Sequence, residues 1–214
     1  MDLWKQYKES LFEIFSDLEW SSDWATWTGK GIDLTAKIYT SPHILKSREV
    51  EIWNDTSCIY NTIIYPKTGK NLPCFGMDLM GFFDKKVIIV FDFQHPTPNY
   101  NFDNPFMSCH LSDMRNNTEK DIRFFEAGNH FSEYIYLRKC TMSEVNDHLD
   151  VFRRYLTVYK NMLEYSGPTE EDTSVYTEFD QYMTKLDPVG GYLSNKFGKE
   201  KSESLVNDFL FCYG

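Results

Sequence analysis

The sequence predicts an α+β fold in which helices cover both faces of one antiparallel sheet. Three observations predict this fold. The N-terminal segment repeats apolar residues every three or four positions, as an amphipathic helix does. Short β-branched and aromatic segments with short connections follow, which favours antiparallel strands. The C-terminal part of the chain then returns to the helical spacing.

The N-terminal helix and the strands that follow it can be delimited from these patterns. The apolar stripe of the helix consists of Leu3, Tyr7, Leu11, Ile14, Phe15 and Leu18. The strands expected between about residues 34 and 93 are LTAKIYT, EVEIW, CIYNTIIY, FGMDLMGFF and KVIIVFDF. Turn-forming stretches such as PKTGKN separate them. Residues 96–117 are rich in Pro, Asn and Asp, which predicts an excursion from the sheet.

A further strand, EYIYLRKC, and then helices are expected in the C-terminal half. Thr141 and Glu144 form a capping box, which marks a helix start. The apolar stripe of that helix comprises Val145, Leu149, Phe152, Leu156, Tyr159 and Leu163. The next helix carries Val175, Phe179, Met183 and Leu186. The sequence DPVGG at 187–191 ends it, and a last helix spans about 201–211. No repeat or long linker divides the chain, so residues 1–214 are expected to form one domain.

Composition argues against several classes of protein. The net charge of −10 argues against non-specific nucleic-acid binding. No apolar run is long enough to span a membrane, and the charged N-terminus does not resemble a secretory signal, so a cytoplasmic protein is expected. The five cysteines are scattered without CxxC spacing, which predicts reduced thiols rather than disulfides or a zinc site.

Familiar cofactor motifs are absent. The chain contains no GxGxxG, P-loop, GxSxG or HExxH sequence, and its histidines show no metal-ligand spacing. We therefore expect neither a metal nor a nucleotide cofactor. Aromatic residues reach 17% of the chain, which suits a pocket that stacks on a flat conjugated ligand.

Carboxylates are the remaining candidates for chemistry. Asp78 is the one acid in the apolar stretch PCFGMDLMGFF and projects to the same face of its strand as Met80 and Phe82. In a pocket it would stay protonated and act as a proton donor, whereas at a strand end it would pair with a lysine on the rim. Asp92 in VFDFQHP, on the neighbouring strand, is a similar candidate for a proton donor. Asp187 fits ordinary turn chemistry at the end of a helix.

Cationic side chains suggest two further features. Arg123 in IRFFEAGNHF and Arg138 in YIYLRKC could bind a ligand carboxylate with a forked pair of hydrogen bonds, or stack on a neighbouring ring. The lysine clusters are either solvated surface or a basic rim that docks an acidic partner. They comprise Lys46, Lys67, Lys70, Lys85 and Lys86, and then Lys196, Lys199 and Lys201.

Several strings together resemble the ferredoxin-dependent bilin reductases. They are LPCFGMDLM, VIIVFDFQHP, GNHFS with the strand that follows it, LDPVGGY and VNDFLF, and the resemblance covers nearly the whole chain. The nearest match is the cyanophage branch that makes phycoerythrobilin. The resemblance implies a three-layer α/β/α sandwich, and a radical mechanism without an enzyme-bound metal or flavin. Reduced [2Fe-2S] ferredoxin would supply single electrons to bound biliverdin IXα, and the protein would supply protons.

The resemblance also implies roles for individual residues. Asp78 matches the central proton-donating aspartate, and Asp187 matches a second aspartate on the helical side of the pocket. Asn61 falls where the phycocyanobilin-forming members place a catalytic histidine. Because an amide cannot relay a proton as imidazole does, this difference argues against phycocyanobilin as the product. Arg123 and Arg138 would bind the propionates of the substrate.

Glu51 roughly matches an acid that the phycocyanobilin-forming members use on ring D, but the local spacing differs and no catalytic role is assigned to it. The function implied is four-electron reduction of biliverdin IXα to phycoerythrobilin through 15,16-dihydrobiliverdin, in the cytoplasm of an infected cyanobacterial host if a phage encodes the protein. A monomer is expected, because a flat-ligand pocket open to an electron donor needs no partner subunit. Two alternatives stay open: a two-electron reductase that stops at 15,16-dihydrobiliverdin, and a bilin carrier without turnover.

Overall fold

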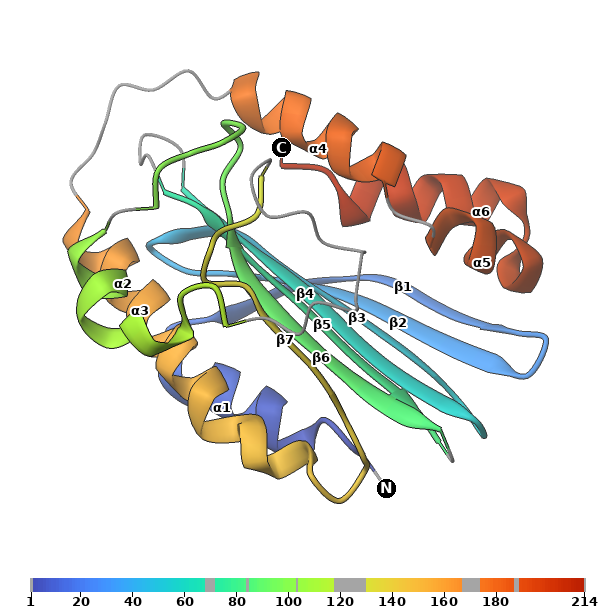
Figure 1. Ribbon diagram of the computed structural model, residues 1–214. Coiled ribbons are helices and arrows are strands. Elements are labelled where there is room, and N and C mark those ends of the chain that lie inside the picture. The colour runs from blue at the N-terminus through green and yellow to red at the C-terminus, as the bar shows by residue number, and fades with distance from the viewer. Residues whose placement is uncertain are drawn as a thin grey trace.

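A seven-stranded antiparallel sheet lies between two groups of helices in the computed structural model (Figure 1). The structure describes residues 2–67, 72–83, 85–102, 104–117, 130–166, 174–186 and 189–213. The strands lie side by side in chain order: β1 (Glu19–Gly29), β2 (Ile32–Thr40), β3 (Ile44–Asn54), β4 (Ser57–Pro66), β5 (Cys74–Phe82), β6 (Lys86–Gln94) and β7 (Tyr136–Cys140). The predicted α+β fold is confirmed.

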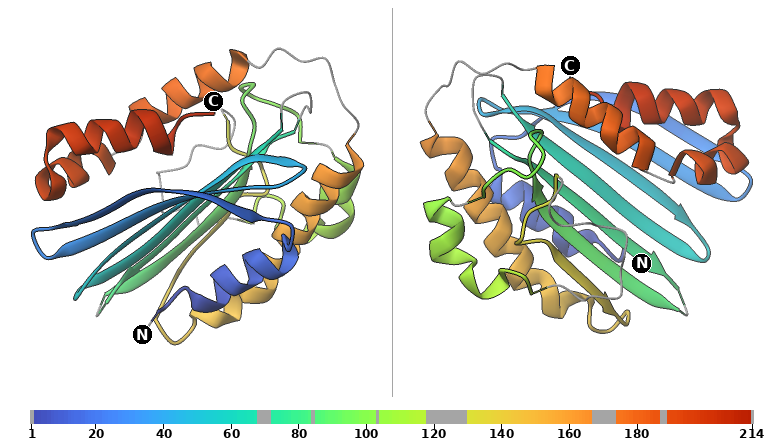
Figure 2. Two further views of the ribbon diagram at one scale, coloured as in Figure 1. Left: turned by 180° about the vertical axis from the view of Figure 1, so that it is seen from behind. Right: turned by 45° about the horizontal axis from the view of Figure 1, so that its top comes forward.

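Helices cover both faces of this sheet, as Figures 1 and 2 show. One face carries α1 (Lys5–Ile14), α2 (Pro105–His110) with the short η1 (Ser112–Met114), and α3 (Leu149–Tyr165), which η2 (Val145–His148) precedes. The other face carries α4 (Ser174–Leu186), α5 (Val189–Phe197), α6 (Lys199–Ser204) and η3 (Leu205–Leu210). The three-layer α/β/α arrangement is therefore confirmed.

Alternation along the strands assigns each side chain to one of the two helical layers. On β5, Phe75, Met77 and Leu79 belong to the core beneath α1 and α3. The intervening residues, Asp78 among them, face α4, α5 and α6. Aromatic rings also pack within the layer of α1 and α3, where the ring centroids of Tyr7 and Phe152 lie 5.0 Å apart. The position of Asp78 therefore follows from the same alternation that builds the core.

Most of the elements predicted from periodicity are present. The apolar stripes correspond to α1, α3 and α4, and the predicted strands correspond to β2 to β7. The capping contact is also present, because Glu144 Oε2 accepts hydrogen bonds of 2.8 Å from both the amide and the hydroxyl of Thr141. The chain then makes the 3₁₀ turn η2 before α3 begins at Leu149.

Three elements differ from the prediction. Strand β1 was not predicted, because its residues are mostly polar or exposed and two register shifts interrupt its pairing with β2. Helix α2 lies within the segment expected to be irregular. Helix α5 contains Gly190 and Gly191, which predicted a break. A Cβ at Gly190 would lie 3.7 Å from Val206 Cγ2, so the small residue suits the close packing of α5 against η3.

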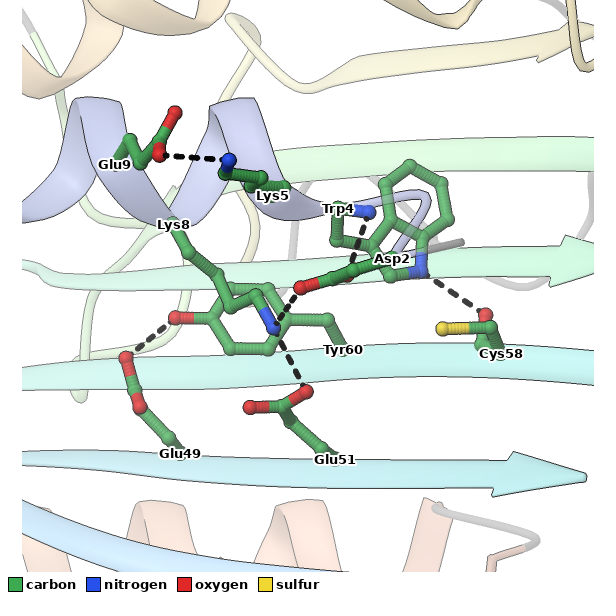
Figure 3. Close-up of polar contacts among 9 residues, drawn as sticks. All are labelled: Asp2, Trp4, Lys5, Lys8, Glu9, Glu49, Glu51, Cys58 and Tyr60. Atoms are coloured by element: carbon green, nitrogen blue, oxygen red, sulfur yellow. Dashed lines mark hydrogen bonds and ion pairs between the residues drawn. The ribbon is translucent and has the colours of Figure 1, made fainter.

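A polar network lies between β3, β4 and α1, as Figure 3 shows. Lys8 Nζ lies 2.7 Å from Asp2 Oδ2 and 2.8 Å from Glu51 Oε2. Glu51 therefore lies on the sheet face opposite to Asp78, in keeping with the absence of a predicted catalytic role. The hydroxyl of Tyr60 donates a hydrogen bond to Glu49, which is 4% exposed. Burial raises the pKa of Glu49 to about 7, although the hydrogen bond from Tyr60 opposes the shift.

We expect Glu49→Gln to stabilise the fold in a pH-dependent way. Between pH 4.5 and about 7 the folded protein keeps a proton on Glu49 that the unfolded chain has lost, so stability falls as pH rises through this window. Glutamine cannot ionise, so the variant should gain up to about 3 kcal/mol above pH 7 and nothing at pH 4. Urea unfolding at several pH values measures the difference. Glu51→Gln is the matched control and should show no gain, and a pH-independent gain for Glu49→Gln would contradict the explanation.

Candidate active site

Asp78 lies at the centre of the sheet face that α4, α5 and α6 cover. It pairs with Asn61 of β4 on one side and with Val90 of β6 on the other. Directly paired residues of an antiparallel sheet project to the same face. The row that runs across the sheet through this position comprises Ala36, Val50, Asn61, Asp78, Val90 and Leu137. Asp78 and Asn61 are thus the polar pair in an otherwise apolar row.

Two hydrogen bonds connect Asp78 to a buried cation. The Asn61 amide nitrogen, Nδ2, donates to Asp78 Oδ1. Arg48 Nη1 donates in turn to the carbonyl oxygen of the same amide, Asn61 Oδ1. Arg48 is 2% exposed and comes from β3, one residue pair further along the same face. Asp78, Asn61 and Arg48 therefore form one continuous polar chain across three strands.

Burial raises the pKa of Asp78, and the hydrogen bond from Asn61 and the charge of Arg48 oppose this shift. The side chain keeps part of its surface accessible, yet it lies deep beneath the helical layer. Desolvation penalises the ionised carboxylate, so the acid holds its proton to a higher pH than a free aspartate does. A protonated carboxyl group with an accessible face can donate that proton to a ligand in contact with it.

Apolar and aromatic side chains cover this face. Met183 of α4 packs against the apolar clusters that contain residues of β2 and β3, of β4, and of β6 and β7. The ring centroid of Phe211 lies 5.6 Å from Arg48 Cζ. Among the described residues of the row through Asp78, the side chains are therefore apolar apart from Asn61 and Asp78 themselves.

Asp92 lies on the same face, paired with Gly76, but its carboxylate is occupied by the backbone near β7. Ser132 N donates to Asp92 Oδ2 at 2.9 Å, and Ser132 Oγ donates to Oδ1. Asp92 is 1% exposed, and burial raises its pKa well above the usual value against these hydrogen bonds. The geometry indicates an anchor for the chain rather than a group that meets a ligand.

The strings that suggested a family in the sequence all lie within one match to a known family. The family model described as ferredoxin-dependent bilin reductase matches residues 12–212. This chain belongs to that family. Members of this family are bilin oxidoreductases that take their electrons from ferredoxin, and the protein shares this family property.

Relatives of this bilin reductase carry two different names. A 15,16-dihydrobiliverdin:ferredoxin oxidoreductase of Nostoc punctiforme is 28% identical over 187 residues, which span 81% of this chain and 76% of the relative. A phycoerythrobilin:ferredoxin oxidoreductase of Prochlorococcus marinus subsp. pastoris is 28% identical over 184 residues, spanning 77% of this chain and 70% of the relative. The sequence comparisons therefore establish the family but do not distinguish between the two activities.

The crystal structure of phytochromobilin synthase from tomato in complex with biliverdin has a TM-score of 0.73 to this bilin reductase. The alignment covers 97% of this chain and 82% of that one at 14% identity. At this identity the likeness supports the fold, which agrees with the layer order described above.

The remaining predicted site residues do not gather around Asp78 in the described parts of the reductase. Arg138 pairs with Ile89 and so lies on the α1 and α3 face. Its guanidinium Cζ is 4.5 Å from the ring centroid of Tyr136, and Nη1 and Nη2 donate to Asn117 O and Oδ1 at 2.8 and 3.0 Å. The structure does not bring Arg138 to the row of residues through Asp78, and its predicted propionate role is not tested. Arg123 and Asp187 lie outside the described residues.

Two functional candidates were not singled out from the sequence. Arg48 lies two positions before Val50 on β3, so it projects to the same sheet face as Val50 and Asn61. Asp180 lies on the inner stripe of α4, three and four positions from Met183 and Tyr176, and is 6% exposed. It accepts hydrogen bonds from Tyr65 Oη at 2.8 Å and from Tyr213 N at 2.6 Å. A charged residue on an apolar stripe was the available signal in both cases.

Other chemistry is sparse in the described parts of the chain. Among those residues, no group of three or more His, Cys, Asp or Glu side chains could hold a metal ion. Within the same residues, no helix combines the length and apolarity needed to cross a membrane. A cleft of about 440 Å³ lies between α4, α5 and α6, and its lining includes Thr184, Ser194, Lys199 and Ser202 but no residue of the Asp78 row.

Proposed function

We propose that this protein reduces biliverdin IXα by four electrons to phycoerythrobilin, through 15,16-dihydrobiliverdin. Reduced ferredoxin would deliver the electrons singly, and each would be coupled to one proton, so that four electrons and four protons are taken up in total. The substrate itself would be the redox-active group. The observation that carries the proposal is the buried carboxyl group of Asp78 in the centre of an apolar row of the sheet, hydrogen-bonded to Asn61, with a pKa that burial raises.

Four of the predicted site residues have a role in this proposal. Asp78 would protonate the bilin radical in the first reduction. Asn61 would orient Asp78 and cannot itself relay a proton, because an amide does not ionise. Asp187 would donate a proton on the helical side in the second reduction, and Arg123 would contact the propionates. Arg138 lies on the sheet face opposite to Asp78 and has no role in the proposal.

Ferredoxin would dock on the basic rim expected from the sequence. Lys46 is already committed to the fold, because its ammonium group donates to the carbonyl oxygen of Cys212. Lys85 and Lys86 are exposed at the start of β6, whereas Lys67 is exposed at the opposite end of the strands, so Lys85 and Lys86 are the better candidates for one contact surface with an acidic partner.

A two-electron reductase that stops at 15,16-dihydrobiliverdin is the second candidate. The relative from Nostoc punctiforme is named for this two-electron activity, which favours the second candidate. A carrier without turnover is disfavoured, because a carrier needs hydrogen bonds to propionates more than it needs a protonated acid within the pocket.

The product of an anaerobic reaction distinguishes these candidates. Biliverdin IXα, the protein, ferredoxin and a ferredoxin-reducing system are incubated, and the bilins are separated by chromatography. We expect wild-type protein to give phycoerythrobilin and Asp187→Asn to accumulate 15,16-dihydrobiliverdin, because the variant lacks the second acid. An end point at 15,16-dihydrobiliverdin for the wild type would favour the two-electron activity. An unchanged yield of phycoerythrobilin from Asp187→Asn would refute the division of roles.

A further inference from the structure

The orientation of one side-chain amide determines how Asp78 can present its proton. Asn61 lies between Arg48 and Asp78, and its amide has a donor end and an acceptor end. A guanidinium group has only donors, so the end that faces Arg48 must be the carbonyl oxygen. The NH₂ group of Asn61 is therefore directed at Asp78 Oδ1.

This orientation selects one oxygen of the carboxyl group. Asp78 Oδ1 accepts a hydrogen bond from the amide, so a proton on that oxygen would meet the hydrogens of the NH₂ group. The proton of the neutral acid is thereby restricted to Oδ2. In the other amide orientation, the Asn61 carbonyl oxygen would accept a hydrogen bond from the carboxyl group of Asp78. The proton would then point at Asn61 instead of at a ligand.

We propose that Arg48 is a positioning residue for proton donation: it fixes the Asn61 amide so that Asp78 keeps its proton on the oxygen free to face the bilin. The proposal rests on the proposed role of Asp78 as the proton donor. Arg48 acts through Asn61 and has no assigned contact with the substrate.

The surroundings of Arg48 suit such a role. It projects from β3 to the diagonal position beside Asn61. The ring of Phe211 lies 5.6 Å from its guanidinium carbon. A buried cation held by neighbours from both the sheet and the C-terminal segment keeps a fixed direction, which a positioning group requires.

Arg48 also acts on Asp78 through its charge. The other titratable side chains that the described strands and α4 place on this face include Lys46, Tyr65, Cys74, Lys86, Asp92, Lys139, Tyr176 and Asp180. Among the described residues, Arg48 is the charge that acts on Asp78, and it acts on Asp180 as well. Loss of Arg48 should therefore leave Asp78 protonated over a wider range of pH and yet slow its proton transfer. A residue needed only for folding would not produce this combination.

The kinetic test is a double-mutant cycle on the first reduction of bound biliverdin, followed by single-turnover absorbance. Arg48→Met should slow this step by roughly tenfold, the kinetic equivalent of one hydrogen bond. Arg48→Lys, which keeps a donor-only cation, should recover part of the rate. In an Asn61→Ala background, Arg48→Met should cost less than about twofold, because the amide through which it acts is gone.

A second measurement needs no substrate. Infrared difference spectroscopy of the free protein, with Asp78→Asn to assign the carboxyl band, gives the titration midpoint of Asp78. Arg48→Met should move this midpoint to higher pH. Arg153→Met is the matched control, because Arg153 pairs with Glu13 on the opposite helical layer, and it should change neither the midpoint nor the rate.

Independent, multiplying rate effects of Arg48→Met and Asn61→Ala would overturn the proposal, as would an unchanged midpoint. If Arg48→Met does not fold, Arg48→Gln replaces it, since glutamine loses the charge and can present either end to Asn61. If the wild-type protein does not reduce biliverdin, the proposed function fails by that result alone. The titration of the free protein then still tests whether Arg48 acts on Asp78.

Discussion

Asp78→Asn should abolish the reduction of biliverdin while the bilin still binds. Asparagine has nearly the same shape, so the pocket and the contact with Asn61 can be kept, but an amide cannot donate a carboxylic proton. Loss of a positioned general acid typically slows a reaction by about 10² to 10⁴-fold. The rate of biliverdin consumption with reduced ferredoxin measures the effect, and the absorbance of the bilin complex reports binding separately.

The pH dependence of the wild-type reaction provides a linked result. Because burial raises the pKa of Asp78, the acid form is present at low pH and is lost as pH rises through that pKa. The first reduction should therefore slow toward higher pH. Asp92→Asn is the matched control, a buried carboxyl changed on the neighbouring strand of the same face. Full turnover by Asp78→Asn would remove Asp78 from the mechanism.

The fold could be predicted from local patterns wherever one face of an element is apolar. The stripes of α1, α3 and α4 and the apolar runs of β4 to β6 are of this kind, whereas the pairing of Asp78 with Asn61 on one face also needs the register of β4 against β5. Strand β1 is an edge strand with interrupted pairing, so its burial pattern does not alternate cleanly. Helix α5 depends on close contact with η3, a tertiary condition that Gly190 does not reveal in sequence.

The site was predictable in part for a related reason. Asp78 stood out because an unpaired acid in an apolar strand is costly to bury, which points to a function. Arg48 and Asp180 gain their meaning from partners 13 and 115 residues away in the chain, which no local pattern shows. The face of Arg138 depends on the register of β7 against β6. A connection of more than 40 residues joins these two strands, and its length does not determine that register.

Asp92→Ala should destabilise the fold by about 3 to 4 kcal/mol, since it leaves the amide and the hydroxyl of Ser132 buried without their acceptor. Asp92→Asn should cost less, because its carbonyl oxygen can still accept from Ser132 N and its NH₂ group can donate to the hydroxyl. Urea unfolding measures both values. Ser132→Ala is the matched control, because it removes the hydroxyl alone and should cost less than Asp92→Ala.

The same variants separate an anchor from a second proton donor. Both carboxyl groups, Asp78 and Asp92, lie on one sheet face with raised pKa values, so protonation alone does not distinguish them. Their partners do: Asp92 is tied to the backbone that leads into β7, whereas Asp78 contacts an amide side chain and keeps an accessible face. Folded Asp92→Asn should therefore reduce biliverdin at close to the wild-type rate. A loss of turnover comparable to that of Asp78→Asn, in a protein that folds and binds the bilin, would make Asp92 a participant in the proton transfer and contradict the anchor role.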